Sequence, residues 1–202
     1  DLTNVPEEEM ALRHYADSLL PLARTEWFPD GARLIDVGTG AGFPGMPLAI
    51  ARPDLKVTLL DSQRKRCDFL SAVCDELKLP NVTVLHARAE DGARGALREQ
   101  MDVAVARAVA PLNVLAEYLL PYVRVGGRML CWKGPAVREE MAAGERACKM
   151  LGGQAEGLYR LPIEGREHYV HSAIKISATA RRYPRKSGTP SKDPLGILPQ
   201  KP

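Results

Sequence analysis

The chain has 202 residues, of which 45% are hydrophobic and 26% are charged, and its formal net charge is +3. These proportions predict one soluble globular domain and exclude a chain that is disordered throughout, because the apolar content can offset the entropy of ordering. No apolar run approaches the roughly 20 residues of a membrane-spanning helix, and we expect no signal peptide, no membrane contact and a cytoplasmic location.

Strand-like and helix-like segments alternate from about residue 33, after a helical N-terminal part that covers residues 1–30. Short apolar runs predict the strands, and apolar side chains at i, i+3 and i+4 predict the helices. The predicted strands cover residues 34–37, 57–60, 82–85, 101–106, 128–132, 155–160 and 169–176, and the predicted helices cover 44–51, 64–77, 112–122 and 137–151. This alternation predicts an α/β fold with a mostly parallel seven-stranded sheet and helices on both faces. In such sheets, ligands bind at the carboxyl ends of the strands.

The positive charge is concentrated at the C-terminus. Residues 181–202 hold six basic side chains and one acid, whereas residues 1–180 carry 22 basic and 24 acidic groups. This stretch is rich in proline and glycine and has no periodicity, so we predict a single domain over residues 1–180 followed by an extended basic tail. Charge alone favours a polyanionic partner, usually nucleic acid, and a merely solubilising tail equally.

Four cysteines lie along the chain without the paired spacing of a zinc site or the density of a disulfide scaffold. We therefore predict no metal site, and free thiols in a reducing compartment. The four are Cys67, Cys74, Cys131 and Cys148.

A glycine-rich turn follows the first predicted strand directly. It runs from Asp36 to Gly45 as Asp-Val-Gly-Thr-Gly-Ala-Gly-Phe-Pro-Gly. Gly40, Gly42 and Gly45 satisfy the G-x-G-x-x-G pattern of dinucleotide sites. Gly38, Gly40 and Gly42 equally satisfy the G-x-G-x-G loop of S-adenosylmethionine enzymes. The glycines alone leave both cofactors open, together with a tight turn that binds nothing.

One acidic side chain follows each of the first three predicted strands. Asp36 lies two residues before Gly38, where a carboxylate could face a cationic amino or sulfonium group but would repel a pyrophosphate. Asp61 ends the second strand, where an acid can accept hydrogen bonds from ribose hydroxyls. Glu90 follows the third strand after Ala89, a place suited to adenine contacts. Because a positively charged nucleoside fits these acids, the sequence favours S-adenosyl-L-methionine over NAD.

The segment after the fourth predicted strand bears on the chemistry. It lacks the Asn/Asp-Pro-Pro-aromatic sequence used on exocyclic amines and the Pro-Cys nucleophile used on pyrimidine carbon 5. Instead, Arg107 and, after the fifth strand, Lys133 offer cations, and these are our candidate catalytic residues. Guanine N7 carries an in-plane lone pair, so its attack needs no general base, and a cation near O6 can orient the base. The pattern permits methylation at N7 without proving it.

Several stretches resemble one known family in the same order along the chain. They are the Gly-Phe-Pro-Gly turn at 42–45, Leu-Asp-Ser at 60–62, Lys-Gly at 133–134, the opening Leu2-Thr3 and the tail sequence Arg-Tyr-Pro-Arg-Lys-Ser-Gly-Thr-Pro at 182–190. Nearly end to end, the chain resembles the ribosomal RNA small-subunit methyltransferase G family, also called glucose-inhibited division protein B. That family usually has another helix before the Leu-Thr motif, so we expect an N-terminal piece before Asp1.

The resemblance implies S-adenosylmethionine-dependent methylation of a guanosine at N7 in 16S ribosomal RNA, in a loop near the decoding centre. The partner would be this RNA or a small-subunit particle, and we predict a monomeric enzyme. A NAD-dependent oxidoreductase and a non-catalytic RNA-binding module stay as rival classes. The cofactor-binding residues predicted from the loop, the acids and the resemblance are Asp36, Gly38, Gly40, Gly42, Phe43, Asp61, Ser62, Ala89, Glu90 and Arg107.

The predicted RNA-binding residues are His14, Arg64, Lys65, Arg182, Tyr183, Arg185 and Lys186. His14 lies three residues before Asp17 on one helix face, which fits either an RNA-facing rim or a packing pair. Cations that open a helix oppose its dipole, which indicates an external anion or simply a solvated start. In the tail, the cations would neutralise phosphates and Tyr183 would stack on a base. We expect the tail to contribute nothing to cofactor affinity, and we predict structural roles for His168 and His171.

Overall fold

The computed structural model describes residues 5–107 and 110–198, and within them seven strands form one sheet in the order β3-β2-β1-β4-β5-β7-β6. The strands are β1 (Arg33–Val37), β2 (Lys56–Asp61), β3 (Val82–His86), β4 (Met101–Arg107), β5 (Val123–Lys133), β6 (Gly153–Arg160) and β7 (Tyr169–Lys175). Strands β1 to β5 pair in parallel, and β7 runs antiparallel to both of its neighbours. The predicted α/β fold with a mostly parallel seven-stranded sheet is confirmed.

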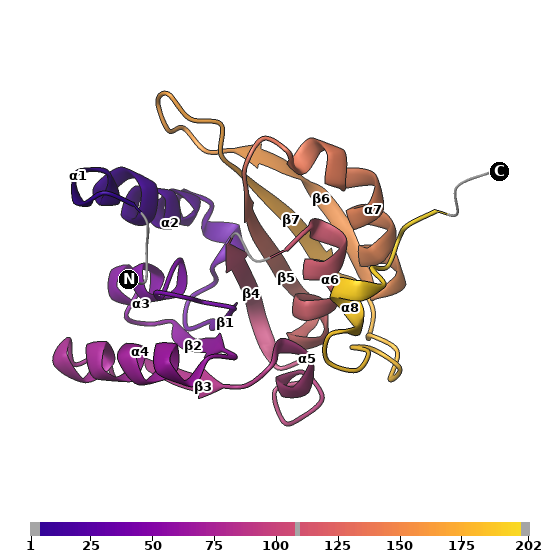
Figure 1. Cartoon of the computed structure of the whole chain (residues 1–202), viewed down its shortest axis with the longest axis horizontal. Coiled ribbons are helices and arrows are strands. Elements are labelled where there is room, and N and C mark those ends of the chain that lie inside the picture. The colour runs from indigo at the N-terminus through magenta and orange to yellow at the C-terminus, as the bar shows by residue number, and fades with distance from the viewer. Residues whose placement is uncertain (1–4, 108–109, 199–202) are drawn as a thin grey trace.

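Helices cover both faces of this sheet (Figure 1). The N-terminal helical turns and α3 and α4 lie on one face, and α6 and α7 lie on the other. The bounds are α1 (Glu7–Met10), η1 (Ala11–Ala16), α2 (Asp17–Leu19), η2 (Leu20–Ala23), η3 (Thr25–Trp27), α3 (Gly45–Ala51), α4 (Arg64–Glu76), α5 (Ala89–Gly92), α6 (Leu112–Leu119), η4 (Leu120–Tyr122), α7 (Val137–Met150) and α8 (Thr189–Lys192).

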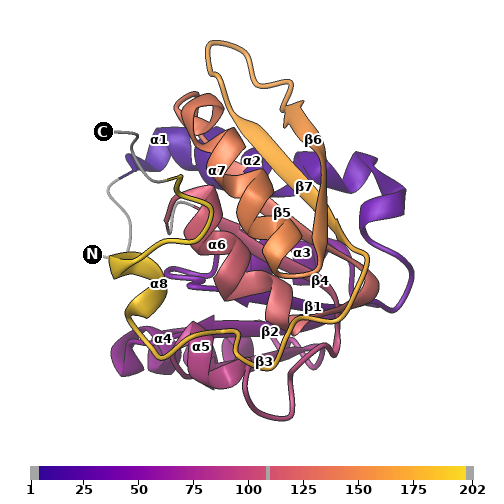
Figure 2. The same cartoon turned by 90° about the vertical axis from the view of Figure 1, so that its right-hand side faces the viewer.

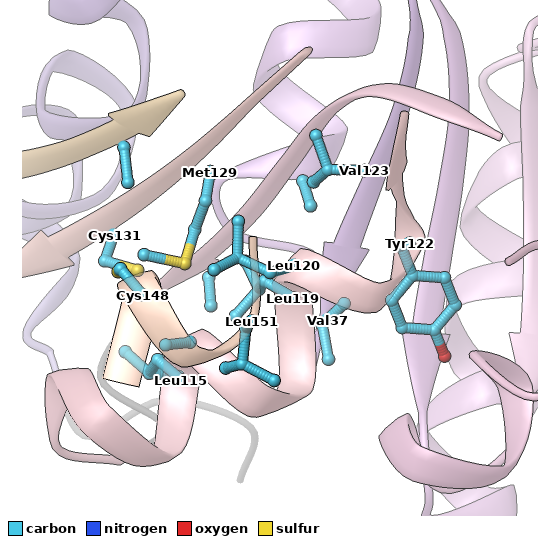
Figure 3. Packing of buried hydrophobic residues seen from close by; sticks show 14 of the residues in the cluster. Val37, Leu115, Leu119, Leu120, Tyr122, Val123, Met129, Cys131, Cys148 and Leu151 are labelled. Carbon is cyan, nitrogen blue, oxygen red and sulfur yellow. The ribbon is translucent and has the colours of Figure 1, made fainter. Parts of the chain in front are cut away.

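Two hydrophobic clusters, one on each face, follow from the two-residue period of the strands. In β4, Val103 and Val105 belong to the cluster under α3 and α4, whereas Ala104 and Ala106 belong to the cluster under α6 and α7. Figure 3 shows the second cluster, where Leu115 and Leu151 lie near Met129 and Cys131. A strand with both faces buried must be apolar at nearly every position, which is why short apolar runs identified the central strands.

The described part of the C-terminus differs from the predicted extended tail. Residues 181–198, called here the C-terminal segment, pack against the body beside α5 and α6 and include the short helix α8 (Figure 2). Tyr183, Pro190 and Leu195 are buried. The prediction was wrong because the local charge count ignored Glu117, a fully buried carboxylate of α6 that pairs with Arg185. Residues 199–202 and the Leu2-Thr3 motif lie outside the described residues.

The described residues contain no helix that is both long and apolar enough to cross a membrane. Over the same residues, no group of three or more His, Cys, Asp or Glu side chains is arranged to hold a metal ion. The four cysteines are free.

Candidate functional site

A cavity of about 220 Å³ opens at the carboxyl ends of β1, β2 and β3. Its lining includes Gly38 after β1, Ser62 after β2, and the connection from β3 into α5, which carries Ala89 and Glu90. Strand β1 pairs with β2 on one side and β4 on the other, so the order of strands reverses here. Open α/β sheets bind ligands at this reversal. The cavity, called here the strand-end cavity, therefore lies where the sequence placed the cofactor.

The turn after β1, called here the glycine loop (residues 38–45), depends on its glycines in two ways. Gly38, Gly40 and Gly42 have φ values of 72°, 61° and 99°, which disfavour side chains with a Cβ. At Gly45 the constraint is space, because a Cβ there would lie 2.5 Å from Leu59 and 2.8 Å from Oδ2 of Asp36. A Cβ at Gly40 would meet nothing within 4 Å, so a ligand can approach the backbone at that point.

Asp36 is fully buried beneath this loop. Its Oδ2 accepts hydrogen bonds from the Thr39 hydroxyl at 2.7 Å and from the Gly45 N–H at 2.8 Å. Its Oδ1 is buried and has no hydrogen-bond partner within residues 5–107 and 110–198. Burial raises the pKa of this carboxyl to about 6, although both hydrogen bonds act in the opposite direction. A positive group near Oδ1 would therefore favour the ionised form.

Asp61 ends β2, as predicted, and holds the backbone of the glycine loop and of the residue before α4. Its Oδ2 accepts from the Gly40 N–H at 3.0 Å, and its Oδ1 accepts from the Gln63 N–H at 2.8 Å. Arg66, in the first turn of α4, lies 3.4 Å from Oδ2. An internal carboxylate thus balances one of the three cations that open α4, and Arg64 and Lys65 remain exposed.

A second group of side chains, called here the Arg107 cluster, joins the N-terminal turns to the end of β4. The guanidinium of Arg107 donates from Nη1 to Oδ2 of Asp17 at 3.1 Å, and its Nη2 lies 3.1 Å from Nδ1 of His14. It also lies over the ring of Phe43 at 5.0 Å, and the rings of His14 and Phe43 stack at 4.5 Å. Phe43 thus links the glycine loop to this cluster.

Asp17 lies at the centre of the cluster, and the sequence left open whether it packs or faces RNA. Asp17 is fully buried, and its Oδ1 accepts from Nδ1 of His168 at 2.7 Å, across 151 positions of the chain. Its backbone carbonyl accepts from the indole of Trp132. The prediction that His168 is structural missed this contact, because nothing local marks a pair so far apart. Burial, followed by the nearby Arg107 charge, lowers the pKa of His14 and favours its neutral ring.

Lys133 does not line the strand-end cavity, although it was predicted beside Arg107. Its ammonium lies 2.7 Å from Oε2 of Glu140 and donates to the carbonyl of Ala110 at 2.9 Å. Residues 108–109, which follow Arg107, lie outside the described residues. Lys133 therefore connects Glu140 of α7 to Ala110, which precedes α6. Its catalytic role stays a prediction.

Two of the predicted RNA-binding residues need correction. Tyr183 is only 5% exposed, so it offers no face to a base. Arg185 pairs with Glu117 at 2.8 Å and with Asp193 at 2.9 Å, so its charge is already balanced. Arg182 and Lys186 are exposed, as the prediction requires. The four side chains are close in sequence but differ in their packing. Tyr183 and Arg185 face the body, whereas Arg182 and Lys186 face solvent.

Comparison with known proteins gives a consistent result. A family model described as rRNA small subunit methyltransferase G matches residues 1–168. The curated ribosomal RNA small subunit methyltransferase G of Alkaliphilus oremlandii is 47% identical over 199 residues, which cover 96% of this chain and 83% of that protein. The same-named protein of Leuconostoc mesenteroides is 46% identical over 200 residues, with 96% and 83% covered. A solved methyltransferase described as S-adenosylmethionine-dependent, from Aquifex aeolicus, has a TM-score of 0.61 at 16% identity and covers 85% of this chain and 94% of its own.

Proposed function

The chain belongs to the rRNA small subunit methyltransferase G family, and we propose that its strand-end cavity binds S-adenosylmethionine while the Arg107 cluster orients the target base. The family methylates 16S ribosomal RNA on a guanine N7 with this cofactor. The observation that supports the location best is the strand-end cavity itself, which brings the glycine loop, Ser62 and Glu90 to one place.

The residues present fit the cofactor. Gly40 leaves the backbone open to a ligand and Gly38 lines the cavity. Oδ1 of Asp36, which has no hydrogen-bond partner among the described residues, lies buried beneath the same loop. Ser62 after β2 supplies a hydroxyl group and Glu90 after β3 supplies a carboxylate group for the ribose and the adenine. When bound, S-adenosylmethionine supplies a methyl group activated by a sulfonium. Asp61 acts on this site by holding the Gly40 amide in place.

For the base, the chain's own contribution is orientation. Guanine N7 attacks with its lone pair, so the protein removes no proton, and catalysis rests on proximity and alignment. Arg107 uses three N–H groups on Asp17, on the Arg13 carbonyl and on His14. A guanidinium has five, so with respect to the described residues two remain for an acceptor such as guanine O6. The neutral His14, stacked on Phe43, provides a flat surface without adding positive charge beside a ring that becomes cationic.

The exposed cations supply the RNA contact in this proposal. Arg64 and Lys65 open α4, and Arg182 and Lys186 lie on the outer side of the C-terminal segment. Each would neutralise phosphates of 16S ribosomal RNA and make affinity depend on salt. We propose a monomer that acts in the cytoplasm on this RNA or on a small-subunit particle.

Two measurements test the proposal. Isothermal titration should show binding of S-adenosylmethionine and none of NAD. Incubation with naked 16S ribosomal RNA and, separately, with small ribosomal subunits should transfer methyl groups, and nucleoside analysis should identify 7-methylguanosine. Methylation of an exocyclic amine or a ribose would contradict the lone-pair mechanism, and transfer to neither RNA substrate would contradict the proposed function.

A further inference from the structure

The C-terminal segment supplies part of the wall of the strand-end cavity. Gly188 and Ser191 line it beside Tyr118 of α6. The backbone N–H of Gly188 donates to Oε1 of Glu90 at 2.7 Å, and the hydroxyls of Ser191 and Tyr118 lie 2.7 Å apart. A cavity built on β1, β2 and β3 is therefore completed by a residue that lies 98 positions after its partner.

Anchors on both sides hold this stretch in place. Before it, Arg185 pairs with the buried Glu117, and Arg98 donates to the carbonyl of Tyr183 at 2.8 Å. After it, the side-chain amide of Asn113 donates to the carbonyl of Leu195 at 2.8 Å. Glu117 is fully buried, so separating it from Arg185 would leave an uncompensated charge. The stretch between the anchors is thus kept against the cavity rather than free in solvent.

The contact with Gly188 determines what Glu90 can offer to a ligand. The side chain of Glu90 lies in the wall and the residue is only 4% exposed. With Oε1 occupied by the Gly188 N–H, its orientation is fixed and Oε2 remains as acceptor. Next to it, the hydroxyl of Ser187 donates to Oδ1 of Asp91 at 2.9 Å. A nucleoside presents suitable donors to such an oxygen, namely an exocyclic amine and ribose hydroxyls.

We propose that residues 187–191 are part of the S-adenosylmethionine site, where they cover the adenosine end and hold Glu90 in its accepting orientation. This inference rests on the proposed function, which places the cofactor in the strand-end cavity. The adenosine end is identified by Ser62 after β2 and by Glu90 after β3. The proposal replaces the expectation that the tail contributes nothing to cofactor affinity.

The test compares two substitutions in the full chain. Ser191→Phe adds bulk at the cavity wall, and Lys192→Phe adds the same ring one position later, at an exposed residue outside the lining. Isothermal titration with S-adenosylhomocysteine and with adenosine gives the affinities, and thermal unfolding checks the fold. Ser191→Phe should weaken both ligands at least fivefold, about 1 kcal/mol, whereas Lys192→Phe should stay within twofold of the unaltered protein. Tyr118→Phe removes only the hydroxyl that contacts Ser191 and serves in place of Ser191→Phe should that variant unfold, with the same fivefold threshold.

Three results would overturn the inference. They are a loss below fivefold in the test variant, an equal loss in Lys192→Phe, and a loss for S-adenosylhomocysteine without one for adenosine, which would put the segment elsewhere than the adenosine end. If the unaltered protein binds neither ligand, the proposed cofactor site fails instead, and the two failures are thereby distinguished.

Discussion

The glycine loop and the Arg107 cluster meet at Phe43, yet they are built in opposite ways. In the loop, the contacts of Asp36 join residues close in sequence, namely Thr39 and Gly45, and the contact of Gly40 with Asp61 spans 21 positions. In the cluster, Asp17 reaches Arg107 and His168 across 90 and 151 positions. The loop is a local structure that a short sequence can specify. The cluster exists only after the whole sheet has formed.

This difference determines what each region tolerates. The loop is limited by backbone conformation at Gly38, Gly40 and Gly42, which have positive φ values, and by space at Gly45. The cluster is limited by charge balance, because Asp17 is fully buried and only 14% of the Arg107 side chain is exposed. Removing one partner of such a pair leaves a buried charge without compensation. Substitutions in the two regions should therefore change different measured quantities.

The largest expected effect is in the loop. Gly45→Ala would place a Cβ against Leu59 and Asp36, and overpacking of a tight interior costs about 3 kcal/mol. The free energy of unfolding from urea denaturation should fall by about that amount, and S-adenosylmethionine binding should weaken with it. Gly40→Ala is the matched control, because it meets no atoms and pays only for its φ of 61°, about 1 kcal/mol. Equal losses in the two variants would refute the distinction between space and backbone conformation.

The local contacts could be predicted from the sequence, and the contacts between distant residues could not. The strands, the glycine loop and the acids after β1, β2 and β3 were predictable, because two-residue periodicity, glycine spacing and strand ends are local signals. The contacts of Asp17 with His168 and of Tyr118 with Ser191 were not predicted, because each joins residues far apart in the chain. A charge count over 22 residues could not reveal that Glu117 would neutralise Arg185. An acid within the mostly apolar α6 was a signal that could have indicated it.

The cluster gives the next effect in size. Arg107→Ala should lower kcat/KM for RNA methylation about 100-fold, roughly 2.7 kcal/mol, the usual scale for losing one preorganised donor. Asp17→Asn keeps the guanidinium but removes the charge that positions it, and we expect about a tenfold loss, roughly 1.4 kcal/mol. Arg107→Lys is the control for charge without the planar fork, and it should resemble alanine more than arginine. Steady-state methylation with S-adenosylmethionine at saturation measures all three, and unaltered rates in a folded Arg107→Ala would assign the cluster to packing alone.

The smallest effect returns to the loop and concerns pH. Burial raises the pKa of Asp36 to about 6, above the usual 3.8. The stability that a raised carboxyl pKa contributes is fully present below pH 3.8 and is lost as the pH rises through about 6. A cationic ligand near Oδ1 reverses the preference, because it favours the ionised carboxylate. Affinity for S-adenosylmethionine should therefore fall below pH 6, by up to about tenfold per pH unit or about 1.4 kcal/mol.

The control for this pH effect is Asp36→Asn, which keeps an oxygen for the Thr39 and Gly45 donors but cannot titrate. The affinity of this variant for S-adenosylmethionine should not change between pH 5 and 7. The unaltered protein should lose up to about tenfold per pH unit below pH 6. S-adenosylhomocysteine lacks the sulfonium charge, so its titration tells which cation Asp36 faces. A slope for both ligands identifies the amino group, and a slope for S-adenosylmethionine alone identifies the sulfonium. If Asp36→Asn shows the same slope as the unaltered protein, the carboxylate acts only within the loop, and the local region of the site would then be purely structural.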